Sequence, residues 1–181
     1  MPAKPKPVRA PIVAPVAPIA ILTEPLELSL IGGYGLVSGT IERLSFGPLS
    51  HVDSRRASDG WLYGARSGRI GTIPAGVEWR PPGYYGRVRE HVVMTLQVPQ
   101  AVHDGYWAFL EEQKGKPYNS RGILGMLLNR DWRAPDSWFC SELVGRAGEV
   151  SKLYPTLFTP TDRVTPVEIA LLWSGLGATK Q

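Results

Sequence analysis

The chain has 181 residues, 43% of them hydrophobic, which is enough for one domain with a buried core. Its 20 basic and 16 acidic side chains give a formal net charge of +4, and no basic run predicts a nucleic-acid groove. The single cysteine, Cys140, excludes an intramolecular disulfide and any zinc site made from several cysteines. We therefore expect neither a nucleic-acid partner nor a metal or other cofactor.

The first 25 residues predict a disordered tether rich in proline and alanine. Basic residues precede an apolar stretch there, as in a signal peptide, but Pro11, Pro15 and Pro18 prevent the continuous apolar helix that a signal requires. No later segment has about 18 uninterrupted apolar residues, so we expect no stable membrane insertion. Residues 26–181 are predicted to form the folded domain, which the tether would attach to a larger assembly.

Short strands and turns are predicted in the first half of this domain. Alternating apolar residues predict the strands, and turn signals such as Asp59-Gly60 separate them. Apolar residues at helical spacing predict a short helix at 36–44. The segment 79–85 is rich in proline, glycine and aromatic residues and is predicted to be a loop. The predicted strands are residues 26–31, 49–53, 61–66, 70–73 and 88–98.

Helices are predicted in the second half. Pro99 opens the first of them and Gly115 stops it, and Thr165-Pro166 starts the last, which ends at Gly175. Two more are expected between these, one with its apolar face at 123–128 and one carrying Cys140. Strands followed by helices predict an α+β fold, in which a small antiparallel β-sheet or barrel packs against helices.

Cys140 is the first candidate functional residue. It follows Asp136 and Ser137, which are good N-cap residues, so we expect it in the first turn of a helix. Unpaired N–H groups and the helix dipole favour a thiolate at that position. A buried structural thiol is the alternative, because free cysteine is among the most buried residue types.

A cysteine nucleophile needs a base, and the chain has three histidines. His103 is expected on the polar side of a helix, and His91 lies in a strand after several charged residues. His51 starts a predicted strand just after Gly47-Pro48, and strand ends over a cleft often carry a catalytic base. On this pattern alone, a structural role for His51 remains an open alternative.

Three segments together resemble a known family. Residues 50–53, 59–66 and 138–144 resemble the circularly permuted branch of the NlpC-like papain-fold cysteine hydrolases, in which the histidine strand precedes the cysteine helix. Residues 30–33, 116–118 and 158–160 resemble members of this group as well, and the resemblance covers roughly residues 26 to 172. It implies a circularly permuted papain-like (NlpC-like) fold.

The resemblance also implies roles for single residues. Cys140 would attack a carbonyl carbon as the thiolate, and His51 would act as general acid and base. Relatives often carry a polar or acidic residue on the strand after the histidine, but residues 63–66 contain no carboxylate. Asp53 and Tyr63 are the candidates for orienting His51. Same-face residues of one strand lie about 6–7 Å apart, which speaks against Asp53 and leaves a plain surface carboxylate as its alternative role.

The leading functional prediction is a cysteine peptidase or amidase that cleaves an amide bond in bacterial or phage cell-wall peptides. One alternative keeps the site and makes the protein a lipid acyl hydrolase or acyltransferase, like the lecithin:retinol acyltransferase-like relatives of the same permuted order. Another is a non-catalytic structural module of a phage or secretion apparatus. Without a signal peptide we expect cytoplasmic synthesis, with phage association or a signal-independent route of export.

Overall fold

The computed structural model describes residues 22–120, 136–157 and 160–181. In this part of the chain, strands form one six-stranded sheet in the order β4-β3-β2-β1-β5-β6, and every neighbouring pair is antiparallel. The strands are β1 (Thr23–Gly32), β2 (His51–Arg55), β3 (Leu62–Arg66), β4 (Gly76–Arg80), β5 (Glu90–Pro99) and β6 (Thr179–Lys180).

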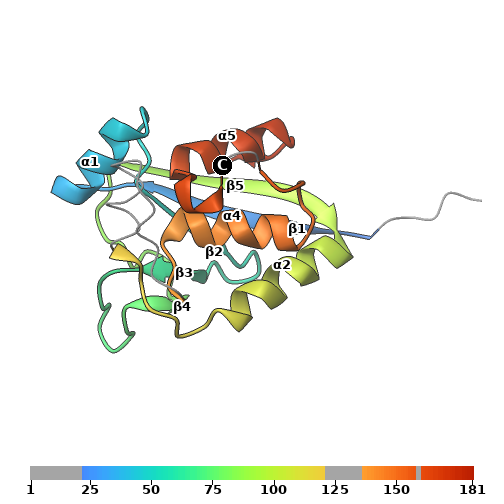
Figure 1. Ribbon diagram of the computed structural model, residues 1–181, viewed down its shortest axis with the longest axis horizontal. Coiled ribbons are helices and arrows are strands. Elements are labelled where there is room, and N and C mark those ends of the chain that lie inside the picture. The colour runs from blue at the N-terminus through green and yellow to red at the C-terminus, as the bar shows by residue number, and fades with distance from the viewer. Residues whose placement is uncertain (1–21, 121–135, 158–159) are drawn as a thin grey trace, which may run out of the picture.

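The helices pack mainly around α4, which crosses the sheet between α2 and α5 and contacts β2 and β3 (Figure 1). Together with the antiparallel sheet, this arrangement confirms the predicted α+β class. None of the described helices is both long and apolar enough to cross a lipid bilayer. The helices are α1 (Leu36–Leu44), α2 (Gln100–Glu112), α4 (Cys140–Val150), the 3₁₀ helix η1 (Thr161–Arg163) and α5 (Pro166–Gly175).

The strand β1 lies between β2 and β5, and both of its faces are buried. Leu26, Leu28 and Leu30 point into the hydrophobic core, since alternate residues of a strand share a face. Glu27 and Ser29 lie on the other face and are buried too, in a polar layer. The helices contribute Tyr106, Leu110, Leu143, Val144, Ile169 and Trp173 to the core. The sheet therefore has an apolar face and a buried polar face, and the candidate site belongs to the polar one.

The sheet differs from the prediction at its first and last strands. Thr23 already pairs with Pro99, so the end of the predicted tether (residues 1–25) is part of β1, and the rest of it lies outside the described residues. The strand β6 was not predicted, because two residues are too short to show a period. The helix predicted at 123–128 also falls outside the described residues.

The fourth strand was predicted too early in the chain. Residues 70–73 form only an isolated bridge between Ile70 and Ile73, whereas β4 includes Trp79 and Arg80, which had been assigned to a loop. The Arg80 side chain is fully buried. Its guanidinium donates to the backbone carbonyls of Gly64 and Gly76 at 2.8 and 2.9 Å, which offsets much of the cost of burying the charge.

Candidate active site

Cys140 is the first residue of α4, in the first helical turn as expected, and only 4% of it is exposed. The helix begins later than predicted, because Phe139 and not Asp136 or Ser137 is the N-cap residue. Glu142 supports this start by accepting a hydrogen bond from the N–H of Phe139 at 3.3 Å. Cys140 therefore lies where free N–H groups of a helix start and its dipole favour an anion.

His51, at the start of β2, is held on one ring nitrogen by two partners. Its Nε2 lies 3.1 Å from Oδ2 of Asp53 and 3.0 Å from the hydroxyl of Tyr84. The Tyr84 hydroxyl in turn donates to Oδ2 of Asp53 at 2.6 Å. Cys140 is within hydrogen-bonding reach of the same imidazole. Since Nε2 is occupied by Asp53 and Tyr84, Nδ1 is the nitrogen left to exchange a proton with the thiol.

Electrostatics keep this imidazole protonated at neutral pH. Burial alone would lower the pKa of His51, but the negative charges of Asp53 and of the Cys140 thiolate raise it to about 10. Burial would likewise raise the pKa of Asp53, yet the charge of His51 and the hydrogen bond from Tyr84 bring it below its usual value. The pKa of Tyr84 is raised by burial and by Asp53, so its hydroxyl remains a donor.

Asp53 contacts His51 more closely than the sequence reasoning allowed. The repeat of about 6–7 Å between same-face residues refers to the backbone of a strand. Strand side chains lean along the strand, and here the imidazole and the carboxylate close the gap to 3.1 Å. Asp53 is also fully buried, so it is not a surface carboxylate.

Tyr63, the other predicted partner of His51, lies elsewhere. It pairs directly with Ser54, so these two side chains share a sheet face, and Asp53 beside Ser54 points to the opposite one. The Tyr63 ring packs edge-on against Trp79, and its buried hydroxyl has no hydrogen-bond partner in the described structure. The prediction for Tyr63 was therefore wrong, because the register of the two strands was not known.

Tyr84 takes the place that had been given to Tyr63, and sequence reasoning missed it. It comes from the loop after β4, 33 residues beyond His51. The aromatic content of the segment 79–85 was the available signal, and this loop had been proposed only as a wall of a groove.

Gly64 on β3 gives Asp53 its room. A Cβ atom added to Gly64 would lie 2.0 Å from Oδ1 of Asp53, which is far inside van der Waals contact. The resemblance implied a polar residue in the segment 63–66. Instead, this segment makes room for Asp53, because Gly64 has no side chain. The orienting carboxylate comes from β2 itself.

Tyr118 forms a bridge with Trp138, two residues before Cys140, and the charge of Cys140 acts on it. The backbone around it is fixed beside the cysteine helix, because Trp138 donates to the carbonyl of Pro117 at 3.1 Å and accepts from Asn119 at 2.9 Å. Burial raises the pKa of Tyr118, and the charge of Cys140 raises it further. The phenol therefore keeps its proton and is a hydrogen-bond donor close to the thiol.

A cavity of about 150 Å³ adjoins His51. Its wall is mostly polar, and two arginines, Arg66 and Arg87, contribute to it. Tyr34, Ser38, Ser50 and Tyr85 are among the other lining residues. This composition suits a small polar or anionic group better than a hydrocarbon chain.

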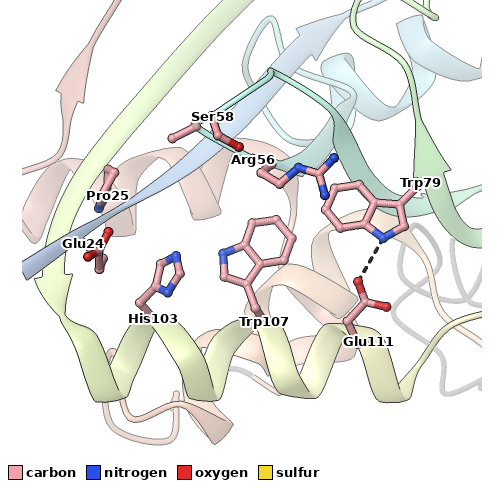
Figure 2. A pocket seen from close by; sticks show the side chains of 9 residues that line it. Glu24, Pro25, Arg56, Ser58, Trp79, His103, Trp107 and Glu111 are labelled. Carbon is pink, nitrogen blue, oxygen red and sulfur yellow. Dashed lines mark hydrogen bonds between the residues drawn. The ribbon is translucent and has the colours of Figure 1, made fainter.

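A larger pocket of about 630 Å³ lies along α2, and neither Cys140 nor His51 lines it (Figure 2). Trp79 stacks on Trp107 with ring centres 5.5 Å apart, and the indole N–H of Trp79 donates to Glu111 at 2.9 Å. The guanidinium carbon of Arg56 lies over the ring of Trp79, 4.5 Å from its centre. His103 lines this pocket as well, so it is remote from the cysteine.

The remaining histidine, His91, is not part of the candidate site. Its Nε2 is 2.9 Å from the hydroxyls of both Ser29 and Tyr85 in the polar layer beside β1. Among the described residues, no group of three or more His, Cys, Asp or Glu side chains is placed to hold a metal ion. The candidate site brings together Cys140, His51 and Asp53.

Comparison with known proteins adds no assignment: no family model and no curated protein matches this chain.

Proposed function

We propose that the protein is a cysteine hydrolase that cleaves amide bonds through an acyl-enzyme on Cys140. The observation that carries this proposal is the position of His51, which is fixed by Asp53 and Tyr84 on Nε2 and reaches Cys140. Nucleophile, base and orienting carboxylate in this sequence are the elements of nucleophilic catalysis in cysteine and serine hydrolases.

The reaction proceeds in two halves. His51 already carries the proton in the resting site, and the Cys140 thiolate attacks the carbonyl carbon to form a tetrahedral oxyanion. The imidazolium then gives its proton to the amine, which leaves as the C–N bond breaks and a thioester forms. In the second half, His51 takes a proton from water, the hydroxide attacks the thioester, and the carboxylic acid and the thiol are released.

Two donors are placed to stabilise the oxyanion. The N–H of Cys140 belongs to the helix start, where backbone donors lack helical partners. The phenol of Tyr118, kept protonated beside the cysteine, is our candidate for the second donor. Such donors typically contribute about 100- to 1,000-fold each to turnover.

The proposal includes a circularly permuted papain-like fold. It is supported by the chain order, in which the histidine strand β2 precedes the cysteine helix α4, and by the packing of α4 on the antiparallel sheet. A papain-like site needs a helix start and a strand end to meet, and His51 and Cys140 occupy those two positions.

As substrates we propose peptides of the bacterial cell wall. The polar cavity beside His51 favours such peptides over the acyl chain of a lipid. An apolar cavity of about 230 Å³ does exist between β5 and α5, but neither Cys140 nor His51 lines it. A site without an orienting acid would favour a non-catalytic module, and here Asp53 lies 3.1 Å from His51.

The test is hydrolysis of purified peptidoglycan, followed as release of new amino termini. We expect release by the wild-type protein and none by Cys140→Ser, with both proteins showing the same unfolding transition. Phospholipid vesicles serve as the parallel substrate, and release of fatty acid from them without peptide cleavage would favour the lipid alternative. Equal peptide release by Cys140→Ser would overturn the proposal.

A further inference from the structure

Within the described residues, the side-chain partners of the two arginines in the wall of the cavity beside His51 are aromatic rings. The guanidinium carbon of Arg66 lies 5.0 Å from the ring centre of Tyr84, and that of Arg87 lies 5.7 Å from the ring centre of Tyr34. Neither arginine forms an ion pair within the described residues. An aromatic ring contacts the guanidinium without accepting a hydrogen bond from the N–H groups in its plane. These N–H groups therefore remain available to donate to a ligand.

Other arginines of the same region are paired. Arg55 on β2 forms an ion pair with Glu27, and Arg89 forms one with Glu42. Arg56 binds Asp59 through two nitrogens, with distances of 2.9 and 2.6 Å. Arg66 and Arg87 line the cavity and, unlike these three arginines, form no ion pair within the described residues.

The charges around the cavity are predominantly positive. Asp53 is engaged by His51 and Tyr84, and the described residues that line the cavity include no Asp or Glu. The charge of Arg66 acts on Tyr118, which also senses Cys140, so its field extends from the cavity to the thiol. A partly enclosed site with this balance attracts anions.

We propose that this cavity is a subsite for a carboxylate of the substrate, which places a free carboxylate next to the scissile amide. The planar forks of Arg66 and Arg87 match the two oxygens of a carboxylate, and a volume of about 150 Å³ holds such a group on a short stem. The proposal rests on the proposed function, because it defines the substrate class of the same thiol.

The test compares two alkylating agents of nearly equal shape, iodoacetate and iodoacetamide. In both reactions the Cys140 thiolate forms a C–S bond to the methylene carbon and iodide leaves, so only the carboxylate differs. As Cys140 is the only cysteine, mass spectrometry reads one site. We expect the ratio of iodoacetate to iodoacetamide rates to be at least about 10-fold higher than in the unfolded chain.

Arginine variants assign this preference. Arg66→Gln and Arg87→Gln should each lower the iodoacetate rate by about 10-fold and leave the iodoacetamide rate within about 2-fold, because each removes one charge-assisted hydrogen bond. Arg69→Gln is the matched control, since Arg69 is exposed and does not line the cavity. A ratio that survives in the double variant would overturn the carboxylate subsite.

A measurement on the wild-type protein does not depend on the folding of any variant. Sodium acetate should slow iodoacetamide labelling of Cys140, and acetamide at the same concentration and ionic strength should not. Equal effects of the two would also overturn the subsite. The release of amino termini from peptidoglycan separates the two proposals. Release by a protein that does not prefer iodoacetate would overturn the carboxylate subsite alone. A preference for iodoacetate in a protein that releases no amino termini would overturn the cell-wall substrate alone.

Discussion

The proton on His51 is the central feature at the scale of the residue. Burial opposes it, and the charges of Asp53 and Cys140 hold it in place. Because Asp53 and Tyr84 both bind Nε2, the ring has one orientation and presents its other nitrogen to the thiol. In the proposed mechanism, the orientation of the ring and the retention of its proton both depend on the Asp53 carboxylate.

The substitution Asp53→Asn removes the negative charge of the side chain and keeps its shape. We expect peptide turnover to fall by about 1,000- to 10,000-fold, the scale seen when a hydrolase base loses its orienting carboxylate. The pKa of His51 should fall as well, which NMR titration of the imidazole measures. Asp59→Asn is the control, because Asp59 is exposed and pairs with Arg56. Unchanged turnover in Asp53→Asn would remove the carboxylate from the mechanism.

Tyr84→Phe keeps the ring and removes the hydroxyl that donates to Asp53. The buried carboxylate then loses a partner, which should lower the free energy of unfolding by about 1–3 kcal/mol and raise the pKa of Asp53. Urea denaturation checks the first effect. Tyr154→Phe provides the comparison, since the Tyr154 hydroxyl donates to the carbonyl of Gly145 instead, and turnover there should stay near the wild-type value.

Sequence reasoning found Cys140 and His51 because each is a rare residue type inside a short motif. It named Asp53 but misjudged its reach, because side-chain lean within a strand is not visible in a periodicity. Tyr84 was missed for a different reason. A contact between a loop residue and a strand 33 positions earlier depends on how the chain returns, which no local pattern encodes.

At the scale of the element, β3 leaves room for Asp53 because Gly64 has no side chain. Gly64 faces Asp53, and the strand passes close enough that even a methyl group would collide with the carboxylate. The neighbouring residues of β3 fill the core on the other face with Tyr63 and Ala65. One short strand thus completes the core and leaves space for the site.

Gly64→Ala should damage the site more than the fold. The added methyl group displaces Asp53 from His51, so we expect at least about a 100-fold loss of turnover, together with about 1–3 kcal/mol of destabilisation from overpacking. Steady-state kinetics and urea denaturation measure the two effects. Gly68→Ala, in the open loop after β3, should change neither. Full activity of Gly64→Ala would show that Asp53 can move without consequence.

The elements with a long and regular period were predicted well. The strands β1 and β5 and the helices α2 and α5 lie close to their expected positions, because a long run of buried residues averages over local exceptions. The strand β4 was predicted too early because the proline, glycine and aromatic content of 79–85 indicated a loop that included its last two residues. The buried Arg80 donates to the carbonyl of Gly64 on β3 and to that of Gly76 on its own strand, and the first contact forms only in the folded sheet.

At the scale of the whole molecule, the charge pair ties stability to pH. The pKa of His51 in the folded state, about 10, lies above its ordinary value of 6.5. The imidazolium therefore contributes stability that is fully present below pH 6.5 and is lost as the pH rises through about 10. Asp53 acts in the opposite direction, since its lowered pKa makes its contribution disappear on acidification.

His51→Gln should flatten the alkaline side of this profile. Between pH 6.5 and 10, the free energy of unfolding of the wild-type protein should fall relative to the variant, by up to about 1.4 kcal/mol per pH unit. Urea titrations at several pH values measure the difference. Both proteins keep Cys140, because its interaction with His51 contributes to the raised pKa of the imidazole. Parallel profiles would mean that His51 is not held as the imidazolium.

The short strand β6 has a consequence for how the molecule behaves in concentrated solution. Lys180 and Thr179 pair with Met94 and Thr95, and the N–H of Gln181 donates to Val93 at 2.9 Å, so these three residues cover part of the outer edge of β5. An uncovered edge of a long strand invites pairing with a second molecule. Removal of residues 179–181 should therefore promote self-association, which sedimentation velocity would detect as a faster species at high concentration.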